Sequence, residues 1–407
     1  MKILGTSLFF TVVLFIGLTV ATFAQSTWST KSVDGFTPRT YPCAAVVDGK
    51  IYVIGGYVTV GVPGTVDAVE VYNPANDTWQ TPTTTGTYTP RGGASASVVG
   101  SKIYVIGGQD NSGTAVNTVE VFDTKTNTWS KPTVAGAFTA RHRHVAGVIF
   151  DKLIVVAGGQ GASSYDVSLQ VFDTETNSWS TPQVTGTFTF RRAASSVVVN
   201  NKLYVFGGFN GSKAFNTLEM FDPENNTWSN PTTDNGNAKR YGGSATLLNN
   251  NIYLIGGFDF QFIVTDVEVF NTKTNEWDME NTTNDFTFRS GVVAAAVDNT
   301  IYVIGGATLQ SVSATNEALK PIATSVHFDT QNTTVAVMPN PATEAIQCVG
   351  LPETTTRATI TNAIGMEVGN YALSANAIIP VTDLASGVYY IQILTSHGTI
   401  VRTFVKQ

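Results

Sequence analysis

Cysteine and charge are both scarce in this chain of 407 residues. Its two cysteines, Cys43 and Cys348, are too few for a disulfide-stabilised scaffold or for a zinc or iron–sulfur site built from several cysteines. Only 13% of the residues are charged, and 23 Lys and Arg against 30 Asp and Glu leave a formal net charge of −7. The chain therefore lacks the basic surface that a nucleic acid would need, and we expect no nucleic-acid partner.

Long apolar runs are scarce too, and the one at the N-terminus has a characteristic context. Residues 8–20 are predominantly apolar, Lys2 precedes them, and the small residues Ala21 and Ala24 follow. This order is typical of a secretory signal peptide, so we predict that residues 1–24 are removed after Ala24. A membrane anchor is the alternative, but the run is shorter than the roughly 20 residues of a spanning helix. We expect an exported mature chain without a transmembrane segment.

Short motifs recur about every fifty residues along most of the chain, and such a period indicates an array of similar units. Pairs of glycines stand at Gly55-Gly56, Gly107-Gly108, Gly158-Gly159, Gly207-Gly208, Gly256-Gly257 and Gly305-Gly306. All six tryptophans follow the same rhythm, at Trp28, Trp79, Trp129, Trp179, Trp228 and Trp277. An arginine precedes each glycine pair by 16 or 17 residues, at Arg39, Arg91, Arg141, Arg191, Arg240 and Arg289.

Within one unit the pattern predicts four short strands. Small residues from Gly93 to Val99 come first, followed by the apolar run Ile103–Ile106, the alternating segment Thr118–Phe122 and a strand containing Trp129. The apolar run is hydrophobic on both faces, so each small sheet needs cover on both sides. Radial stacking of four-stranded blades provides that cover.

These motifs resemble kelch repeats. The resemblance depends on the double glycine that ends the second strand, the aromatic residue in the third and the tryptophan in the fourth, and it covers residues 26–331 in six copies. It implies an all-β fold, with a six-bladed kelch β-propeller over residues 25–331.

The phase of the repeats indicates how the propeller closes. Trp28 precedes every glycine pair, whereas no tryptophan follows Gly305-Gly306. Because Phe328-Asp329-Thr330 repeats the end of an earlier third strand, we place the third strand of the sixth blade at Thr324–Phe328. The strand around Trp28 would then complete that blade. The alternative, in which Thr334–Val337 is the fourth strand, stays open.

After residue 331 the rhythm stops and short alternating strands begin. This region resembles the C-terminal sorting domain of the Bacteroidetes type IX secretion system, through the Pro339-Asn340-Pro341 turn, the segment Asp383–Tyr389 and a terminal strand ending at Lys406. The resemblance implies a small β-sandwich over residues 332–407 and a partnership with the type IX secretion machinery. It also implies delivery across the outer membrane to the cell surface or the medium.

Residues that recur in every unit are most economically explained as structural. The glycine pairs permit positive φ and close backbone approach, and the tryptophans fill the blades. The repeated arginines have polar counterparts in the third strands, with which they can form buried bidentate pairs. These counterparts are Glu70, Glu120, Gln170, Glu219 and Glu268.

Positions where the repeats differ are the candidates for ligand binding. They follow the repeated arginines and should meet near one mouth of the central channel, where we predict ligand contacts from His142, Arg143, His144, Arg192 and Tyr241. Aromatic residues of the loops after the glycine pairs are candidate stacking surfaces, at Tyr57, Tyr165, Phe209, Phe258, Phe260 and Phe262.

The sequence nominates no catalytic residue, metal ligand set or cofactor. His142 and His144 are two residues apart, but two ligands are too few for a metal site. The acidic residues of the variable loops suggest no carboxylate pair, at Asp110, Asp166, Asp259, Asp266 and Glu317. Our first hypothesis is an exported binding module for a protein or a glycan. The alternative is a carbohydrate-active enzyme similar to the kelch-type sialic acid mutarotases.

Overall fold

The computed structural model describes residues 26–60, 64–161, 167–233, 238–280, 282–283, 286–321, 336–351, 357–362, 367–373, 378–395 and 398–407. Their contacts divide the chain into two compact units, Met1–Ile322 and Ala323–Gln407. The signal peptide expected at residues 1–24 and the domain boundary expected after residue 331 both lie outside the described residues. Among the described residues, no helix is long and apolar enough to cross a membrane.

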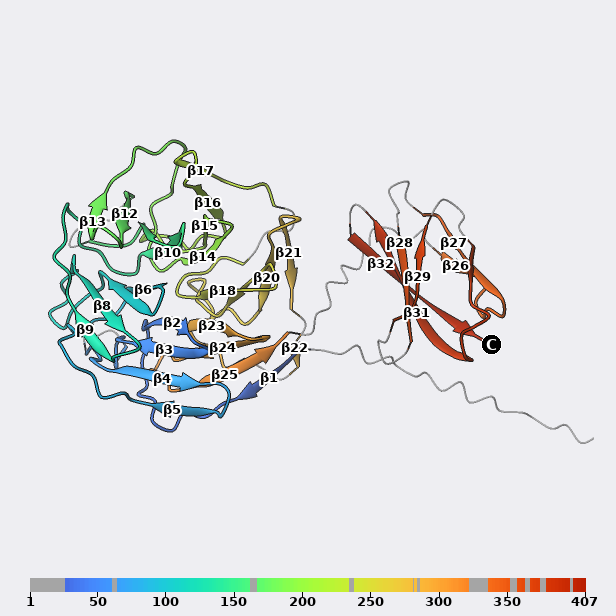
Figure 1. The fold of residues 1–407 in the computed structure, drawn as a ribbon, viewed down its shortest axis with the longest axis horizontal. Coiled ribbons are helices and arrows are strands. Elements are labelled where there is room, and N and C mark those ends of the chain that lie inside the picture. Colours follow the sequence, from blue (N-terminus) through green and yellow to red (C-terminus); the bar gives the residue numbers. More distant parts are fainter. Residues whose placement is uncertain are drawn as a thin grey trace, which may run out of the picture. The chain divides into compact units, whose positions relative to one another are not determined.

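The first unit is a ring of six small sheets whose four main strands are antiparallel to their neighbours (Figure 1). The innermost strands are β2 (Cys43–Val47), β6 (Ser95–Val99), β10 (Val145–Ile149), β14 (Ser195–Val199), β18 (Ser244–Leu248) and β23 (Val293–Val297). The second strands are β3 (Lys50–Ile54), β7 (Lys102–Ile106), β11 (Leu153–Ala157), β15 (Lys202–Phe206), β19 (Asn251–Ile255) and β24 (Thr300–Ile304). The third strands are β4 (Val69–Asn73), β8 (Val119–Asp123), β12 (Leu169–Asp173), β16 (Leu218–Asp222), β20 (Glu268–Asn271) and β25 (Asn316–Lys320).

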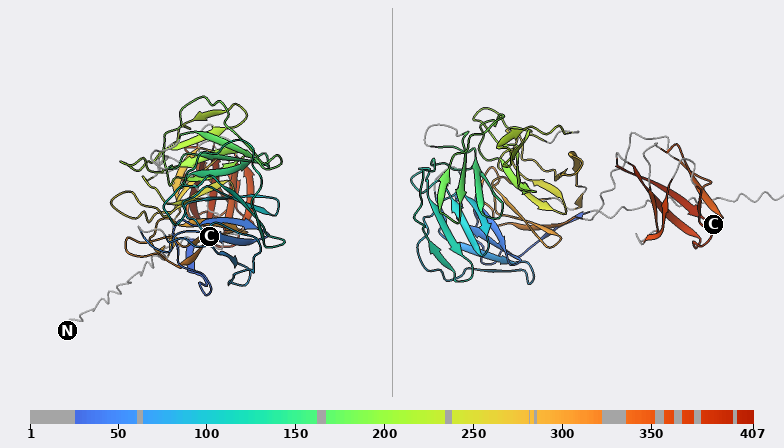
Figure 2. Two further views of the ribbon diagram at one scale, coloured as in Figure 1. Left: turned by 90° about the vertical axis from the view of Figure 1, so that its left-hand side faces the viewer. Right: turned by 45° about the horizontal axis from the view of Figure 1, so that its top comes forward.

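The outer strands of blades one to five are β5 (Thr78–Gln80), β9 (Thr128–Ser130), β13 (Ser178–Ser180), β17 (Thr227–Ser229) and β21 (Glu276–Met279). Each blade packs face to face with its neighbours, as the tilted view also shows (Figure 2). In one such interface Ile54 of the first blade shares a cluster with Ile103 and Val105 of the second, and all three are fully buried. The core of the propeller therefore lies between the blades, because each apolar second strand is covered on both sides.

The N-terminal strand completes the sixth blade. β1 (Ser26–Thr30) pairs antiparallel with β25, so that Trp28 lies opposite Leu319, and the short β22 (Thr282–Thr283) adds to its outer edge. The indole of Trp28 is buried. This confirms that the two ends of the propeller meet in one sheet. The alternative fourth strand at Thr334–Val337 is not used, since β26 (Ala336–Met338) pairs within the second unit.

The predicted third strand of this blade, Thr324–Phe328, is wrong. β25 takes that position in the sheet, and residues 324–328 lie outside the described residues. Leu319, fully buried between Ile301 and Trp28, stands where the other blades have an aromatic residue. An aliphatic side chain fills the same space. The repeat pattern identifies third strands by their aromatic residue, so it does not detect this one.

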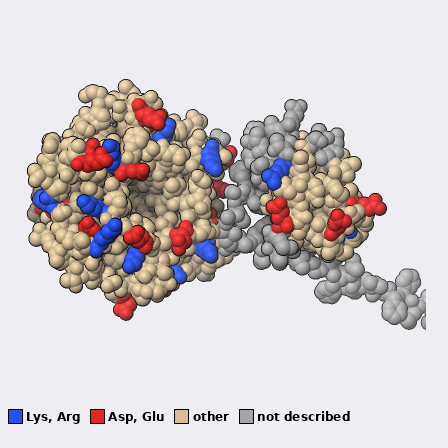
Figure 3. Space-filling view, viewed as in Figure 1, with Lys and Arg blue, Asp and Glu red and all other residues tan. Residues whose placement is uncertain are grey.

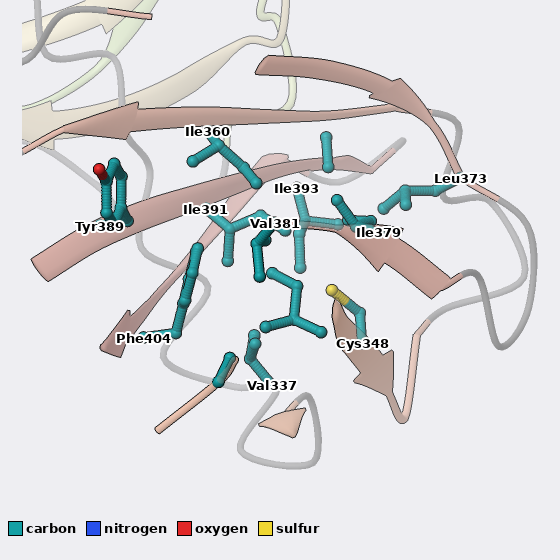
Figure 4. Packing of buried hydrophobic residues seen from close by; sticks show 13 residues of the cluster. Val337, Cys348, Ile360, Leu373, Ile379, Val381, Tyr389, Ile391, Ile393 and Phe404 are labelled. Atoms are coloured by element: carbon teal, nitrogen blue, oxygen red, sulfur yellow. The ribbon is translucent and has the colours of Figure 1, made fainter. Parts of the chain in front are cut away.

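The second unit is a two-sheet sandwich. One sheet has β26, β27 (Ala345–Val349) and β30 (Ile378–Pro380), and the other has β29 (Glu367–Ala372), β28 (Arg357–Asn362), β31 (Gly387–Thr395) and β32 (Gly398–Lys406). Ile360 and Ile391 of one sheet face Cys348 of the other in the core (Figure 4). The predicted turn is tied to the terminal strand, because Asn340 Oδ1 accepts a hydrogen bond from the Val405 amide at 2.9 Å.

Candidate functional site

The repeated arginines are anchored inside the blades, as the sequence predicts. Each is buried, and each except Arg141 forms an ion pair with a third-strand glutamate of its own blade: Arg39–Glu70, Arg91–Glu120, Arg191–Glu219, Arg240–Glu268 and Arg289–Glu317. Arg141 donates instead to Gln170 Oε1 at 2.6 Å. Glu317, expected in a variable loop, lies in β25 as the sixth member of this set. All six guanidinium groups are therefore bonded inside the blades and are not available to a ligand.

The glycine pairs connect each blade to the next. Gly55 has a φ of +61°, and a Cβ added there would lie 2.3 Å from the carbonyl oxygen of Arg91 in the following blade. The amide of Gly56 donates to that same carbonyl at 2.9 Å. The contact recurs around the ring and closes it, since Gly306 donates to the Arg39 carbonyl at 2.8 Å. The first residue of each pair must therefore be glycine, because a Cβ would collide with the carbonyl of the next blade.

Two residues after each repeated arginine, the backbone forms a closed circle of hydrogen bonds, which we call the inner ring. Each amide donates to the carbonyl of the preceding blade's ring residue, at 2.6 to 2.9 Å, and the last bond closes from Tyr41 to Gly291. All six residues have a φ between +48° and +68°. The members are Tyr41, Gly93, Arg143, Ala193, Gly242 and Gly291. This backbone favours glycine, so the long side chains of Tyr41 and Arg143 are exceptional.

The inner ring and the residue after each member line an axial cavity of about 110 Å³. Figure 3 shows the central hollow of the propeller from one face, with charges of both signs on the surface around it. The Arg143 guanidinium carbon lies 4.2 Å from the centroid of the Tyr41 ring and 6.0 Å from that of Tyr57. Arg143 is half-buried, and within the described residues its buried Nε has no hydrogen-bond partner and its side chain no ion pair.

A second circle, the outer belt, surrounds the inner ring. It consists of the residue after each repeated arginine and the residue after each glycine pair, which meet in antiparallel bridges: Thr40–Tyr57, Gly92–Gln109, His142–Gln160, Arg192–Phe209, Tyr241–Phe258 and Ser290–Ala307. In blades two, three and six the belt residues are all small or polar. The part contributed by blades four and five is cationic and aromatic.

The cationic and aromatic part of the belt is a contiguous cluster. Arg192 donates to Gln160 Oε1, and its guanidinium carbon lies 5.4 Å from the Phe209 ring centroid. Tyr241 stacks on Phe209 at 5.0 Å. Phe260 packs against both rings, although 48% of its surface is exposed and its φ is +93°. A non-glycine residue in such a conformation stores strain of the kind that is common at binding sites.

The two predicted histidine contacts are buried. His142 and His144 are 4% and 7% exposed, and His144 Nε2 lies 2.9 Å from Ser95 Oγ. Burial lowers the pKa of His142 to about 4, helped by Arg143 and Arg192. Burial and Arg141 lower the pKa of His144 to about 3. Both rings are therefore neutral near pH 7. In the described part of the chain, no group of three or more His, Cys, Asp or Glu could hold a metal ion.

The structure brings Arg143, Arg192 and Tyr241 to one mouth, where burial raises the pKa of the Tyr241 hydroxyl and the two arginines oppose that rise. Tyr165 lies outside the described residues. The residue that sequence reasoning left out of the site is Tyr41. Its signal is a bulky side chain at a position where four of the other five units have glycine or alanine, the exception being Arg143.

Comparisons with known proteins agree with this architecture. The KLHDC2/KLHL20/DRC7 Kelch-repeats domain matches residues 14–159 and 93–306, and the secretion system C-terminal sorting domain matches residues 336–407. An F-box/kelch-repeat protein of Arabidopsis thaliana is 49% identical over 43 residues, which are 11% of this chain and 12% of that protein.

Further relatives are described as N-acetylneuraminate epimerases. The Pasteurella multocida protein is 45% identical over 76 residues, 17% of this chain and 19% of that protein. A Haemophilus influenzae protein is 40% identical over 78 residues, 18% of this chain and 20% of its own. The chain thus spans a fifth or less of the length of the curated relatives it matches. The chain belongs to the kelch-repeat family and ends in a type IX secretion sorting domain, which takes it across the outer membrane to the cell surface or the medium.

Proposed function

We propose that this exported propeller is a binding module whose mouth holds an acidic protein or glycan ligand. The observation that carries the proposal is the position of Arg143, a half-buried cation at the axis without an ion pair among the described residues. Five of the six repeated arginines neutralise their charge in ion pairs inside the blades, whereas Arg143 presents its charge to the axial cavity. A guanidinium offers planar, bidentate donors to carboxylates.

The outer belt and the neighbouring loop residue Phe260 add a surface on which a ligand can stack. Phe209, Tyr241 and Phe260 form one aromatic cluster, and Arg192 lies against it. Aromatic faces bind both the apolar face of a sugar ring and apolar side chains of a protein. An acidic glycan and an acidic protein segment both fit this surface, with their acidic group directed toward Arg143.

Glycan-array and acidic-peptide-array binding of the secreted protein test this proposal. Arg143→Ala should weaken the strongest interaction at least about tenfold, which corresponds to about 1.4 kcal/mol. Lys125→Ala is the matched control, because it removes the same charge from an exposed hairpin between β8 and β9. Equal binding by parent, Arg143→Ala and Lys125→Ala would show that the mouth is not the binding face.

A carbohydrate-active enzyme is the second candidate, because the local matches include two N-acetylneuraminate epimerases. Such an enzyme would need an acid or base at the mouth. Asp110 and Asp259 both accept hydrogen bonds from their own loops, which lower their carboxyl pKa values and keep them ionised. The two candidates are separated by following a bound glycan over time by NMR, since a binding module leaves it chemically unchanged and an enzyme converts it.

A further inference from the structure

Three glycines of the inner ring make room for the side chains of Tyr41 and Arg143. A Cβ added at Gly93 would lie 3.0 Å from Arg143 Cγ, so the arginine side chain runs over this residue. A Cβ added at Gly291 would lie 2.1 Å from Thr40 Oγ1 and 2.9 Å from the Tyr41 ring. One added at Gly242 would lie 2.7 Å from the Tyr41 hydroxyl oxygen. The tyrosine ring is therefore seated across the first, fifth and sixth blades.

The seated ring is the surface on which the arginine lies. The guanidinium of Arg143 is 4.2 Å from the Tyr41 centroid, a close cation–π distance. The backbones of both residues are fixed by the closed hydrogen-bond circle. Tyr41 thus determines where above the axial cavity the guanidinium is held.

The cavity below has the charge of an anion site. Among the described residues that line it, Arg143 carries the only formal charge, and none is a carboxylate. His144 also lines it but stays neutral. A volume of about 110 Å³ has room for a small anionic group, and an arginine partly removed from water attracts such a group more strongly than an exposed one.

We propose that the axial cavity binds one carboxylate group of the ligand, with Arg143 as its anchor and Tyr41 as the residue that positions Arg143. The proposal rests on the proposed function, because it assigns the acidic group of the ligand to a place within that binding face. It also assigns a role to Gly242, whose lack of a side chain leaves the seat for the tyrosine hydroxyl.

The positioning step can be measured without any ligand. The Nε–Hε signal of Arg143, assigned by its loss in Arg143→Lys, should carry a ring-current shift in ¹⁵N-labelled protein. Tyr41→Phe should keep this shift, whereas Tyr41→Ala should reduce it to the smaller contribution of the Tyr57 ring, 6.0 Å away. If Tyr41→Ala leaves the signal unchanged, the positioning role is overturned.

The anion site is tested by titration with acetate against chloride at equal ionic strength, and with glucuronate against glucose. Acetate and glucuronate should move the Arg143 signal to saturation, whereas chloride and glucose should not. Tyr41→Ala should weaken acetate binding about tenfold and Tyr41→Phe by less than about twofold. An Arg143 signal that does not respond to acetate overturns the site, whatever the arrays show.

A double-mutant cycle tests the seat itself. Gly242→Ala places a methyl against the Tyr41 hydroxyl, and its other neighbours are 3.3 Å away or more. Ala193 shows that alanine can occupy this ring with a similar backbone, at a φ of +51° against +68° for Gly242. Gly242→Ala should therefore weaken acetate binding in the parent but not in Tyr41→Phe, which lacks the hydroxyl. Equal losses in both backgrounds would mean that Gly242 acts only through backbone strain. If the cycle gives the expected result but no glycan or peptide on the arrays binds, the anion site is retained and the proposed function is rejected.

Discussion

Arg191 and Arg143 show how one residue type plays opposite roles in two regions of the propeller. Arg191 lies inside the fourth blade, 1% exposed, with Glu219 at 2.5 Å and the Gly207 carbonyl at 2.8 Å. Arg143 lies at the mouth, half-buried, with an aromatic ring as its close neighbour. The difference teaches that an arginine present in every blade has a structural role inside the blade. An arginine found at its position in only one blade is available to bind a ligand.

The largest effect should come from removing the strand that closes the ring. Deletion of residues 25–33 removes β1, takes Trp28 out of its site and leaves β25 as an unpaired edge. Losing the buried indole alone should cost about 3–5 kcal/mol of unfolding free energy, and the edge adds to this loss. Thermal and denaturant melts measure it.

Trp28→Ala and Trp79→Ala form a matched pair for this prediction. Trp79 occupies the same repeat position in the first blade but is only partly buried, so its replacement should cost less. A deletion variant that melts with the parent would refute closure by the N-terminal strand.

The next largest effect should come from Arg191→Ala. It leaves the Glu219 carboxylate buried without its cation, which should destabilise the fold by about 3–5 kcal/mol in urea titrations. The control is Arg191→Met with Glu219→Leu, which removes both charges together and should be less harmful than the single change. If Arg191→Ala lowers the unfolding free energy no more than the double variant does, an unpaired Glu219 carboxylate is not the cause of the destabilisation.

The sequence predicts these blade interiors well because each depends on a local pattern. Glycine pairs, arginines and tryptophans recur, and their pairing follows from the strand register. The third strand of the sixth blade escapes the pattern because Leu319 stands where the other blades have an aromatic residue, and packing requires only an apolar side chain of suitable size. The inner ring could not be predicted, because it joins residues about fifty positions apart through backbone bonds that no side-chain pattern records.

A pH effect should sharpen the comparison, because His142 and His144 lie next to the mouth yet are buried. Their pKa values fall from the ordinary 6.5 to about 4 and about 3 on folding. The unfolded chain therefore takes up protons below pH 6.5 that the folded chain does not. Each histidine should cost up to about 1.4 kcal/mol of stability per pH unit as the pH falls from 6.5 to 4.

The measurement compares denaturant melts of the parent with those of His142→Ser combined with His144→Ala. Both replacements occur at equivalent positions, in Ser290 and in Ala94 and Ala194. The double variant should lose less stability than the parent over this pH range. Parallel curves would mean that the histidines titrate normally in the folded protein and are exposed at the mouth.

The smallest effect on stability should come from Arg143→Ala. Its φ of +53° is nearly that of Ala193 at +51° in the same ring, so alanine fits this backbone. Removing a half-buried side chain without an ion pair among the described residues should change the unfolding free energy by less than about 0.5 kcal/mol. The same change should weaken binding of an acidic ligand at least about tenfold. If Arg143→Ala melts far below the parent while Arg191→Ala melts with it, the structural and binding positions are exchanged, because the charge at the axis would then be holding the ring together.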